Sequence, residues 1–436
     1  MLYYSTQNPS NKATFKEATI RGQAPDKGLY FPEYIPALPS GFIDTIETLS
    51  KEEIALQVIE PFVAETIPHD VLKNIVAKTV DFDFPLVEVS SGIYALELFH
   101  GPTLAFKDVG ARFMSQCLGY FMQGENKKVT VLVATSGDTG GAVANGFYDV
   151  DGVEVVILYP SGKVSGIQEL QLTTLGKNIT ALEIEGTFDD CQRMVKAAFM
   201  DADLAQALFL TSANSINVAR WLPQQFYYFY AYQQWKAKKL PPVISVPSGN
   251  FGNICAGLMA YRIGLPIAHF VAACNANDAV FDYLKSGSYQ AKPAIATLSN
   301  AMDVGDPSNF VRLLHLFENN HTAIKNIMSA YSVSDDVTKH TIQEVYKNNN
   351  YLLDPHGAVG YKALQEYLAD HKDAAGIFLE TAHPVKFYDV VEPVINSEVP
   401  IPESVRSLFS KTKKSIRMKA SAAALKTFLM DQVKVL

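Results

Sequence analysis

The sequence predicts an α/β protein built on mostly parallel sheets with flanking helices. From Lys127 onward, short runs rich in Val and Ile alternate with helical patterns, and glycine-rich turns join them. The segments KKVTVLVATSGDTGGAVANGF and PPVISVPSGNFGNICAGLMAYRIG both follow this order of strand, turn and helix. Such repeats are typical of parallel sheets that are buried on both faces, whose ligands bind beyond the carboxyl ends of the strands.

The first part of the chain has a different pattern, which predicts a small helical module. Leu49–Val63 is amphipathic, and Ser50 followed by Glu53 matches a capping box at the start of a helix. Val71–Val80 predicts a second helix, and a short strand follows Pro85. We expect this module to occupy residues 1–90.

Composition excludes several classes of protein. The 37 basic and 45 acidic residues give a net charge of −8, which does not favour a nucleic-acid binder. No apolar run is long enough for a membrane helix, and the first residues do not resemble a signal peptide, so we expect a cytoplasmic protein. The four cysteines lie in apolar contexts, and the histidines lack metal-ligand spacing, so we expect no metal site.

Lys107 is the first candidate for chemistry. It lies in HGPTLAFKDVGARFM, with apolar neighbours and one carboxylate, Asp108, beside it. Apolar surroundings disfavour the charged ammonium, so they lower the lysine pKa and leave a nucleophilic amine. An imine with an aldehyde cofactor requires such an amine. The alternative is a solvated lysine that begins the next helix and pairs with Asp108.

The segment VISVPSGNFGNICAGL predicts a strand, a glycine-rich loop over residues 248–253, and a helix. Glycine permits positive φ angles, so successive N–H groups can surround a phosphate at the helix N-terminus. The loop has neither a Walker lysine nor a GxGxxG pattern, which disfavours a nucleotide site. The alternative is an ordinary turn closed by a capping residue.

Two further loops carry groups that suit small anions. In VATSGDTGGAVANG, hydroxyl and N–H groups precede a helix and suit a carboxylate, although Asp138 or Thr139 could simply cap that helix. In TSANSINVARW, the side chains of Asn214, Ser215, Asn217 and Arg220 suit a second phosphate, since arginine offers paired donors. The alternative for the second loop is a set of helix caps with a surface arginine.

The last candidate segment is FLETAHPVKF, an apolar strand that ends at Glu380. The hydroxyl of Thr381 could donate to a ring nitrogen, or Thr381 could be an ordinary strand residue. His383 precedes a proline, which is more typical of a loop histidine than of a catalyst.

Together these segments closely resemble the threonine synthase family, in the branch shared by many bacteria and fungi. The matching pieces run in order from residue 27 to residue 387: KGLYFP, HGPTLAFKD, TSGDTGGA, NSINVAR, SGNFGN, LSNAMDVGDPSNF, DPHGAVGY and ETAHPVKF. The resemblance implies a fold-type II pyridoxal-phosphate enzyme similar to tryptophan synthase β. It also implies a catalytic region over residues 91–436, made of two α/β domains with the active site between them.

Position by position, the resemblance implies a role for each matched residue. Lys107 matches the Schiff-base lysine, and Thr381 matches the hydroxyl that faces the pyridine nitrogen. The loop matched to the cofactor phosphate consists of Gly249, Asn250, Phe251, Gly252 and Asn253. The implied substrate contacts are Ser136, Gly137, Asp138, Thr139, Lys163, Asn214, Ser215 and Arg220. Asp138 departs from many fold-type II relatives, which carry an asparagine whose amide can donate to the cofactor's 3-oxygen.

The reaction that the resemblance implies converts O-phospho-L-homoserine and water to L-threonine and phosphate, by γ-elimination and β-addition of water. This is the last step of threonine biosynthesis. One alternative is a phospho-lyase that gives 2-oxobutyrate, ammonia and phosphate. Another is a cofactor-free protein that binds an anionic amino acid, which would not need Lys107. We expect a small-molecule substrate and no obligate protein partner.

Overall fold

The computed structural model describes residues 1–125, 127–236 and 240–435, and the chain divides into two compact units. The first 90 residues are shared between the units, with residues 2–30 in the second and residues 31–90 in the first. The predicted domains, residues 1–90 and 91–436, remain a prediction. The first unit comprises Met1 with residues 31–106 and 221–400, and the second comprises residues 2–30, 107–220 and 401–436.

A six-stranded sheet forms the centre of the first unit, in the order β12-β11-β10-β13-β5-β4. Its neighbouring strands are parallel, except that β4 at the edge runs antiparallel to β5. Every residue of β10 and β13 is buried, as expected for the middle of a parallel sheet. The strands are β4 (Leu86–Ser90), β5 (Ile93–Glu97), β10 (Val243–Pro247), β11 (His269–Cys274), β12 (Met328–Ser332) and β13 (Gly376–Glu380).

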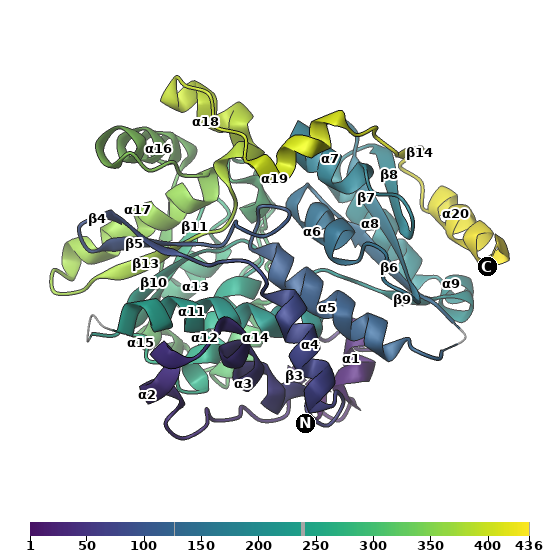
Figure 1. Cartoon of the computed structure of the whole chain (residues 1–436), viewed down its shortest axis with the longest axis horizontal. Helices are drawn as coiled ribbons and strands as arrows, with labels where there is room; N and C mark the ends of the chain where they lie inside the picture. The colour runs from purple at the N-terminus through teal and green to yellow at the C-terminus, as the bar shows by residue number, and fades with distance from the viewer. Residues whose placement is uncertain (126, 237–239, 436) are drawn as a thin grey trace. The chain divides into compact units, whose positions relative to one another are not determined.

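Helices cover both faces of this sheet (Figure 1). Helix α17 packs on β10, β11 and β13 with α16 outside it, while α12 and α11 lie on the opposite face. The helices of the first unit are α2 (Phe42–Thr45), α3 (Lys51–Val63), α4 (His69–Thr79), α11 (Phe226–Trp235), α12 (Gly252–Arg262), α13 (Ala279–Ser286), α14 (Phe310–Leu316), α15 (His321–Ile327), α16 (Asp335–Asn349), α17 (Pro355–Asp370) and α18 (Tyr388–Ile395).

The second unit contains a parallel sheet in the order β14-β8-β7-β6-β9. Residues from three parts of the chain meet here, because the N-terminal helix α1 (Phe15–Arg21) packs beside β9 and the C-terminal strand β14 pairs with β8. The strands are β6 (Val129–Ala134), β7 (Val153–Pro160), β8 (Ile179–Glu185), β9 (Phe209–Thr211) and β14 (Ile416–Lys419).

Helices also cover both faces of the second sheet (Figure 1). Met194 of α8, Leu204 of α9 and Leu425 of α20 join one buried apolar cluster with Leu132 and Leu182 of the strands. Helices α5 and α6 lie on the other face. The helices of this unit, besides α1, are α5 (Lys107–Phe121), α6 (Asp138–Gly146), α7 (Gly166–Thr173), α8 (Phe188–Met200), α9 (Ala202–Ala207), α19 (Glu403–Arg406) and α20 (Ala422–Val435).

The shorter elements near the N-terminus and between the main helices complete the chain. Strands β1 and β2 pair in antiparallel fashion within the second unit. The remaining elements are β1 (Tyr3–Ser5), β2 (Lys12–Ala13), β3 (Tyr30–Pro32), α10 (Val218–Trp221), and the 3-10 helices η1 (Ile46–Thr48), η2 (Leu222–Gln225), η4 (Asn300–Met302), η5 (Pro384–Phe387) and η6 (Ser407–Ser410).

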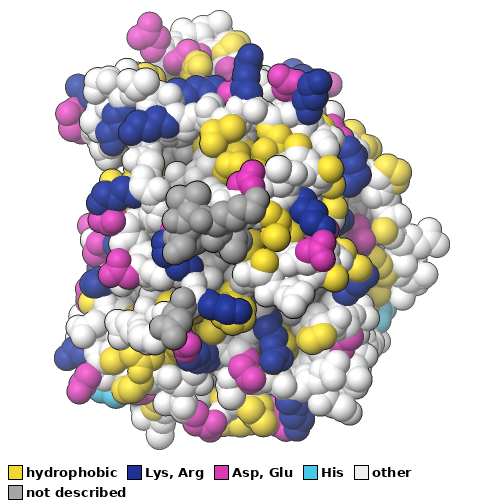
Figure 2. All heavy atoms as spheres, turned by 90° about the vertical axis from the view of Figure 1, so that its right-hand side faces the viewer, with side chains coloured by type: hydrophobic (Ala, Val, Ile, Leu, Met, Phe, Trp, Pro, Cys, Tyr) yellow, Lys and Arg dark blue, Asp and Glu magenta, His cyan; other side chains and the backbone are white. Residues whose placement is uncertain are grey.

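The structure confirms the predicted α/β class with mostly parallel sheets. It also confirms the capping box, since Ser50 accepts from the Glu53 N–H and the Glu53 carboxylate accepts from the Ser50 N–H. The four cysteines are buried free thiols, as predicted. Figure 2 shows basic and acidic side chains interspersed on one face of the molecule. Among the described helices, none has the length and apolarity needed to cross a membrane.

A buried carboxylate attaches the C-terminal segment to the second sheet. Glu183 of β8 accepts hydrogen bonds from Ser161 at 2.6 Å and Ser415 at 3.1 Å, and Lys413 lies 2.8 Å from it. The hydrogen bonds from Lys413 and Ser161 lower the pKa of Glu183 to about 2, from an ordinary value of 4.5. Because the folded pKa lies below the unfolded value, this stabilisation is present above pH 4.5 and is lost as the pH falls toward 2.

We therefore predict that Glu183→Gln lowers the free energy of unfolding by about 1–2 kcal/mol at neutral pH. The difference from the unmodified chain should shrink as the pH falls from 5 to 3, measured by urea unfolding over that range. Glu185→Gln on the same strand is the control, because Glu185 is exposed. An equal difference at every pH would contradict the role of the ionised carboxylate.

Candidate active site

The predicted phosphate loop follows β10 at the carboxyl edge of the first sheet. Residues 248–251 lead directly into α12, and Phe251 adopts a left-handed conformation with φ 58°. As at any helix N-terminus, the N–H groups of the first helical turn point out of the helix end. The backbone of another segment approaches closely. A Cβ atom on Gly249 would lie 2.6 Å from the Cα of Met302 and 3.0 Å from the Ala301 oxygen.

The polar atoms of this loop fit a phosphate. The Asn253 side chain is buried, and its Nδ2 has no hydrogen-bond partner within the described part of the chain. Tyr228 donates to the Oδ1 of the same amide at 2.9 Å. Burial raises the pKa of Tyr228 well above its ordinary value, so this phenol remains a neutral donor. A buried amide donor at a helix N-terminus suits an anion.

Thr381 follows β13 at the same edge of the first sheet and is buried. Its carbonyl oxygen accepts from the Phe106 N–H at 2.9 Å, and the His383 N–H donates to the Leu104 oxygen at 3.0 Å. Ala105 and Ala382 form an antiparallel bridge between these two bonds. The two segments therefore form a short ribbon that fixes the chain immediately before Lys107.

Lys107 is the first residue of α5 and is half-buried. Gly110, one turn further along α5, packs against Arg220. A Cβ atom on Gly110 would lie 2.7 Å from the Arg220 oxygen and 3.1 Å from its Nε. Arg220 itself is 4% exposed, so it is a buried group beside the first turn of α5 and not the surface arginine of the alternative interpretation. The second unit thus brings Lys107 and Arg220 to the same end of one helix.

The predicted carboxylate loop follows β6 of the second unit. The hydroxyl of Thr135 accepts from the N–H groups of Gly137 at 3.0 Å and Gly140 at 2.8 Å. Gly137 has φ 141°, and a side chain there would collide with Gln168. Gln168 of α7 donates through Nε2 to the Asp138 carboxylate at 2.8 Å. Asp138 is therefore a buried acceptor with a defined orientation, and no local sequence pattern indicated its Gln168 partner.

The remaining predicted substrate contacts differ in exposure. Lys163 is exposed in the turn after β7, and Asn214 and Ser215 are half-buried before α10. Asn217, between them and Arg220, donates to the Thr19 oxygen at 2.9 Å and the Ser212 oxygen at 3.1 Å. The side chain of Asn217 therefore holds this loop in shape.

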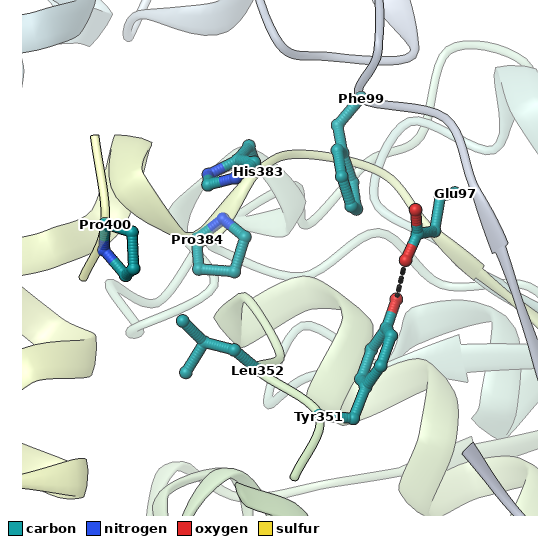
Figure 3. Close-up of a pocket in the computed structure, with 7 residues that line it drawn as sticks. All are labelled: Glu97, Phe99, Tyr351, Leu352, His383, Pro384 and Pro400. Carbon is teal, nitrogen blue, oxygen red and sulfur yellow. Dashed lines mark hydrogen bonds between the residues drawn. The ribbon is translucent and has the colours of Figure 1, made fainter. Parts of the chain in front are cut away.

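His383 lies at a pocket of about 230 Å³ in the first unit (Figure 3). Burial lowers the pKa of His383 to about 4, and its Nδ1 accepts from the Val385 N–H at 3.1 Å. These contacts stabilise the turn into η5. The Tyr351 hydroxyl donates to Glu97 at 2.9 Å. Figure 3 shows this hydrogen bond on one side of the pocket. The lining residues are Glu97, Phe99, Tyr351, Leu352, His383, Pro384 and Pro400.

A buried polar cluster of Glu380, Asp354 and His356 includes the residue before Thr381 in the chain, and the sequence alone assigned the cluster no role. The Glu380 carboxylate accepts from the Asp354 N–H at 2.7 Å, and Asp354 contacts the His356 ring at 2.5 Å. Burial, together with the charge of Asp354, raises the pKa of Glu380 well above its ordinary value. Asp354 and His356 both belong to the segment DPHGAVGY, so the family resemblance of that segment was the sequence signal for them.

Comparison with known proteins decides the family. Residues 2–80 match "Threonine synthase N terminus", residues 83–378 match "Pyridoxal-phosphate dependent enzyme", and residues 357–429 match "Threonine synthase, C-terminal". The threonine synthase of Haemophilus influenzae is 44% identical over 99% of this chain and 100% of its own length. The chain belongs to the threonine synthase family.

Solved structures of the threonine synthase family agree with this membership. Threonine synthase from Escherichia coli has a TM-score of 0.92 at 41% identity, over 99% of this chain and 100% of that one. A pyridoxal-phosphate-bound threonine synthase from Brucella melitensis has a TM-score of 0.94 at 35% identity, over the full length of both. The fold-type II assignment is confirmed, and the chain is a pyridoxal-phosphate-dependent lyase.

We predict that Gly249→Ala weakens binding of pyridoxal phosphate by about 1–3 kcal/mol. The new methyl group would collide with backbone atoms, which can move only if the loop shifts. Titration of the apoprotein with the cofactor, followed by visible absorbance, measures the effect. Gly119→Ala in α5 is the control, since the new Cβ would meet a side-chain methyl group of Val150 at 3.0 Å and no backbone atom. Unchanged cofactor affinity in Gly249→Ala would contradict the placement of the phosphate loop.

Proposed function

We propose that this chain converts O-phospho-L-homoserine and water to L-threonine and phosphate, with Lys107 as the residue that holds the cofactor. The observation that carries the proposal is the position of Lys107. Lys107 directly follows Phe106, whose N–H group donates to the Thr381 oxygen. The chain is also similar over its full length to threonine synthases. In the reaction Cβ loses a proton, the Cγ–O bond breaks and phosphate leaves. Cγ then gains a proton, and water supplies the hydroxyl group at Cβ.

In this proposal, residues of the first unit bind the phosphate and the ring nitrogen of the cofactor. The N–H groups of Gly249, Asn250, Phe251 and Gly252, with the Asn253 amide, bind its phosphate. The hydroxyl of Thr381 donates to the pyridine nitrogen and leaves the ring largely unprotonated. When bound, pyridoxal phosphate supplies an electron sink for negative charge that develops beside the substrate α-carbon.

The residues of the second unit bind and activate the substrate. The amine of Lys107 takes the proton from the substrate α-carbon, since a lysine that holds the cofactor lies beside that atom. Ser136, Gly137, Asp138 and Thr139 form the loop that binds the substrate carboxylate. Arg220, with Asn214, Ser215 and Lys163, binds the substrate phosphate, which arginine can contact with paired donors. The buried position of Arg220 supports this role, because a phosphate there is removed from competing water.

We further propose that the protein acts in the cytoplasm on this small-molecule substrate, without an obligate protein partner. Four buried cysteines that remain free thiols agree with a reducing compartment.

Lys107→Ala should abolish both the visible absorbance of the bound cofactor and the formation of threonine, because no other group replaces the lost amine. Absorbance spectroscopy of the purified variant and chromatographic detection of threonine measure these effects. Lys196→Ala on the exposed side of α8 is the control and should retain both signals. Threonine formation at a near-normal rate by Lys107→Ala would overturn the assignment.

The same assay separates the synthase from the phospho-lyase alternative. Both reactions release phosphate from phosphohomoserine, but one yields threonine and the other yields 2-oxobutyrate and ammonia. Full-length similarity to threonine synthases favours the first product. A product consisting mainly of 2-oxobutyrate would replace the synthase with the lyase.

Arg220→Lys should raise the KM for phosphohomoserine by about tenfold or more, since lysine keeps the charge but loses the paired donors. The cofactor absorbance should stay unchanged, because Arg220 belongs to the substrate contacts. Steady-state kinetics with phosphate release give the KM, and Arg193→Lys, an exposed change on α8, is the control. A normal KM would remove Arg220 from the phosphate contacts.

A further inference from the structure

A short helical turn forms one wall of the predicted phosphate loop. Ala301 and Met302 of η4 provide the backbone atoms that exclude any side chain at Gly249, since they lie 3.0 and 2.6 Å from the place its Cβ would take. Because these are main-chain atoms, a shift of η4 changes the space around Gly249 directly. The position of η4 therefore bears on how well the loop fits its ligand.

Hydrogen bonds hold this turn from two sides. On one side, Asn275 at the end of β11 donates to the Ser299 hydroxyl and to the Asp303 carboxylate, each at 3.0 Å. On the other side, the Ala301 N–H donates to the Nε2 of His356 at 3.2 Å. The second bond uses the lone pair of an imidazole nitrogen, so it exists in one tautomer only.

Asp354 selects that tautomer. Its Oδ1 lies 2.5 Å from the Nδ1 of His356, so the ring proton sits on Nδ1 and Nε2 is free to accept. Asp354 also caps α17 by accepting from the N–H groups of His356 at 2.8 Å and Gly357 at 3.3 Å. His356 is 3% exposed and Asp354 is 0% exposed, which restricts alternative partners such as water.

The same cluster reaches the residue before Thr381. The Asp354 N–H donates to the Glu380 carboxylate at 2.7 Å, and a side chain at Gly357 would collide with that carboxylate. Glu380, Asp354, His356 and Ala301 therefore form one continuous chain of contacts. It connects the end of β13, where Thr381 lies, to the wall of the phosphate loop.

We propose that His356, held in one tautomer by Asp354, is a positioning residue for the cofactor phosphate. Through the Ala301 N–H it fixes η4 against Gly249, and through Asp354 and Glu380 it ties that wall to the strand that carries Thr381. This inference rests on the proposed assignment of residues 249–253 as the phosphate loop. It concerns binding of the phosphate group and not the aldehyde or the ring.

Two variants of His356 separate its two hydrogen bonds. The oxygen of His356→Gln can take the place of Nε2 and accept from Ala301, whereas His356→Asn keeps only a group near Nδ1 and loses that acceptor. We would titrate each apoprotein with pyridoxal phosphate and with pyridoxal, which lacks the phosphate. The ratio of the two affinities, measured on the same variant, is insensitive to a general loss of stability.

His356→Asn should lower the affinity for pyridoxal phosphate by about tenfold, the effect of one buried hydrogen bond, and leave that for pyridoxal unchanged. His356→Gln should restore most of the ratio. His340→Asn, a change at an exposed histidine, should leave both affinities unchanged. Should His356→Asn fail to fold, Asp354→Asn serves instead, because an amide can donate to Nδ1 and so favours the wrong tautomer. An unchanged ratio, or an equal loss for both ligands, would overturn the inference.

One further variant distinguishes failure of this inference from failure of the proposed phosphate loop. Asn253→Asp places a negative charge in the loop and should reduce the ratio if the phosphate binds there. If Asn253→Asp reduces the ratio and His356→Asn does not, only the positioning role of His356 is wrong. If neither variant changes it, the phosphate loop assignment is wrong as well.

Discussion

The hydrogen bond from the Phe106 N–H to the Thr381 oxygen is the contact on which the proposed chemistry depends. It closes a ribbon of two short segments, one entering α5 and the other leaving β13. Tyr227 adds a hydrogen bond from its hydroxyl to the Phe106 oxygen, so both polar groups of this residue's backbone have partners. Since Lys107 is the next residue, its backbone cannot move far from Thr381 without breaking these bonds.

The loops around the site have a common physical origin. Each follows the carboxyl end of a parallel strand, where the chain must turn sharply into a helix or a 3-10 turn. Close packing then excludes a side chain at certain positions. Gly249 meets the backbone of Met302, Gly110 meets Arg220, and Gly137 meets Gln168. The glycines thus allow polar groups from distant segments to approach, and those groups determine which anions can bind.

The sequence predicted the features that depend on local pattern. The alternation of strands and helices, the capping box at Ser50 and the loop after β10 all follow from residues close together in the chain. It did not predict the partners that come from far away. The contact of His356 with Ala301 depends on how α17 and η4 pack, and no spacing rule encodes it. For the same reason Arg220 was open to interpretation as a surface group until its packing on Gly110 was known.

The most direct test of the central claim is to find the lysine that carries the cofactor. Reduction of the holoprotein with borohydride makes the link between lysine and pyridoxal phosphate permanent, and mass spectrometry of its peptides locates the added mass. The account predicts modification of Lys107 in the peptide that contains Phe106. Modification of another lysine instead, such as the buried Lys386, would contradict it.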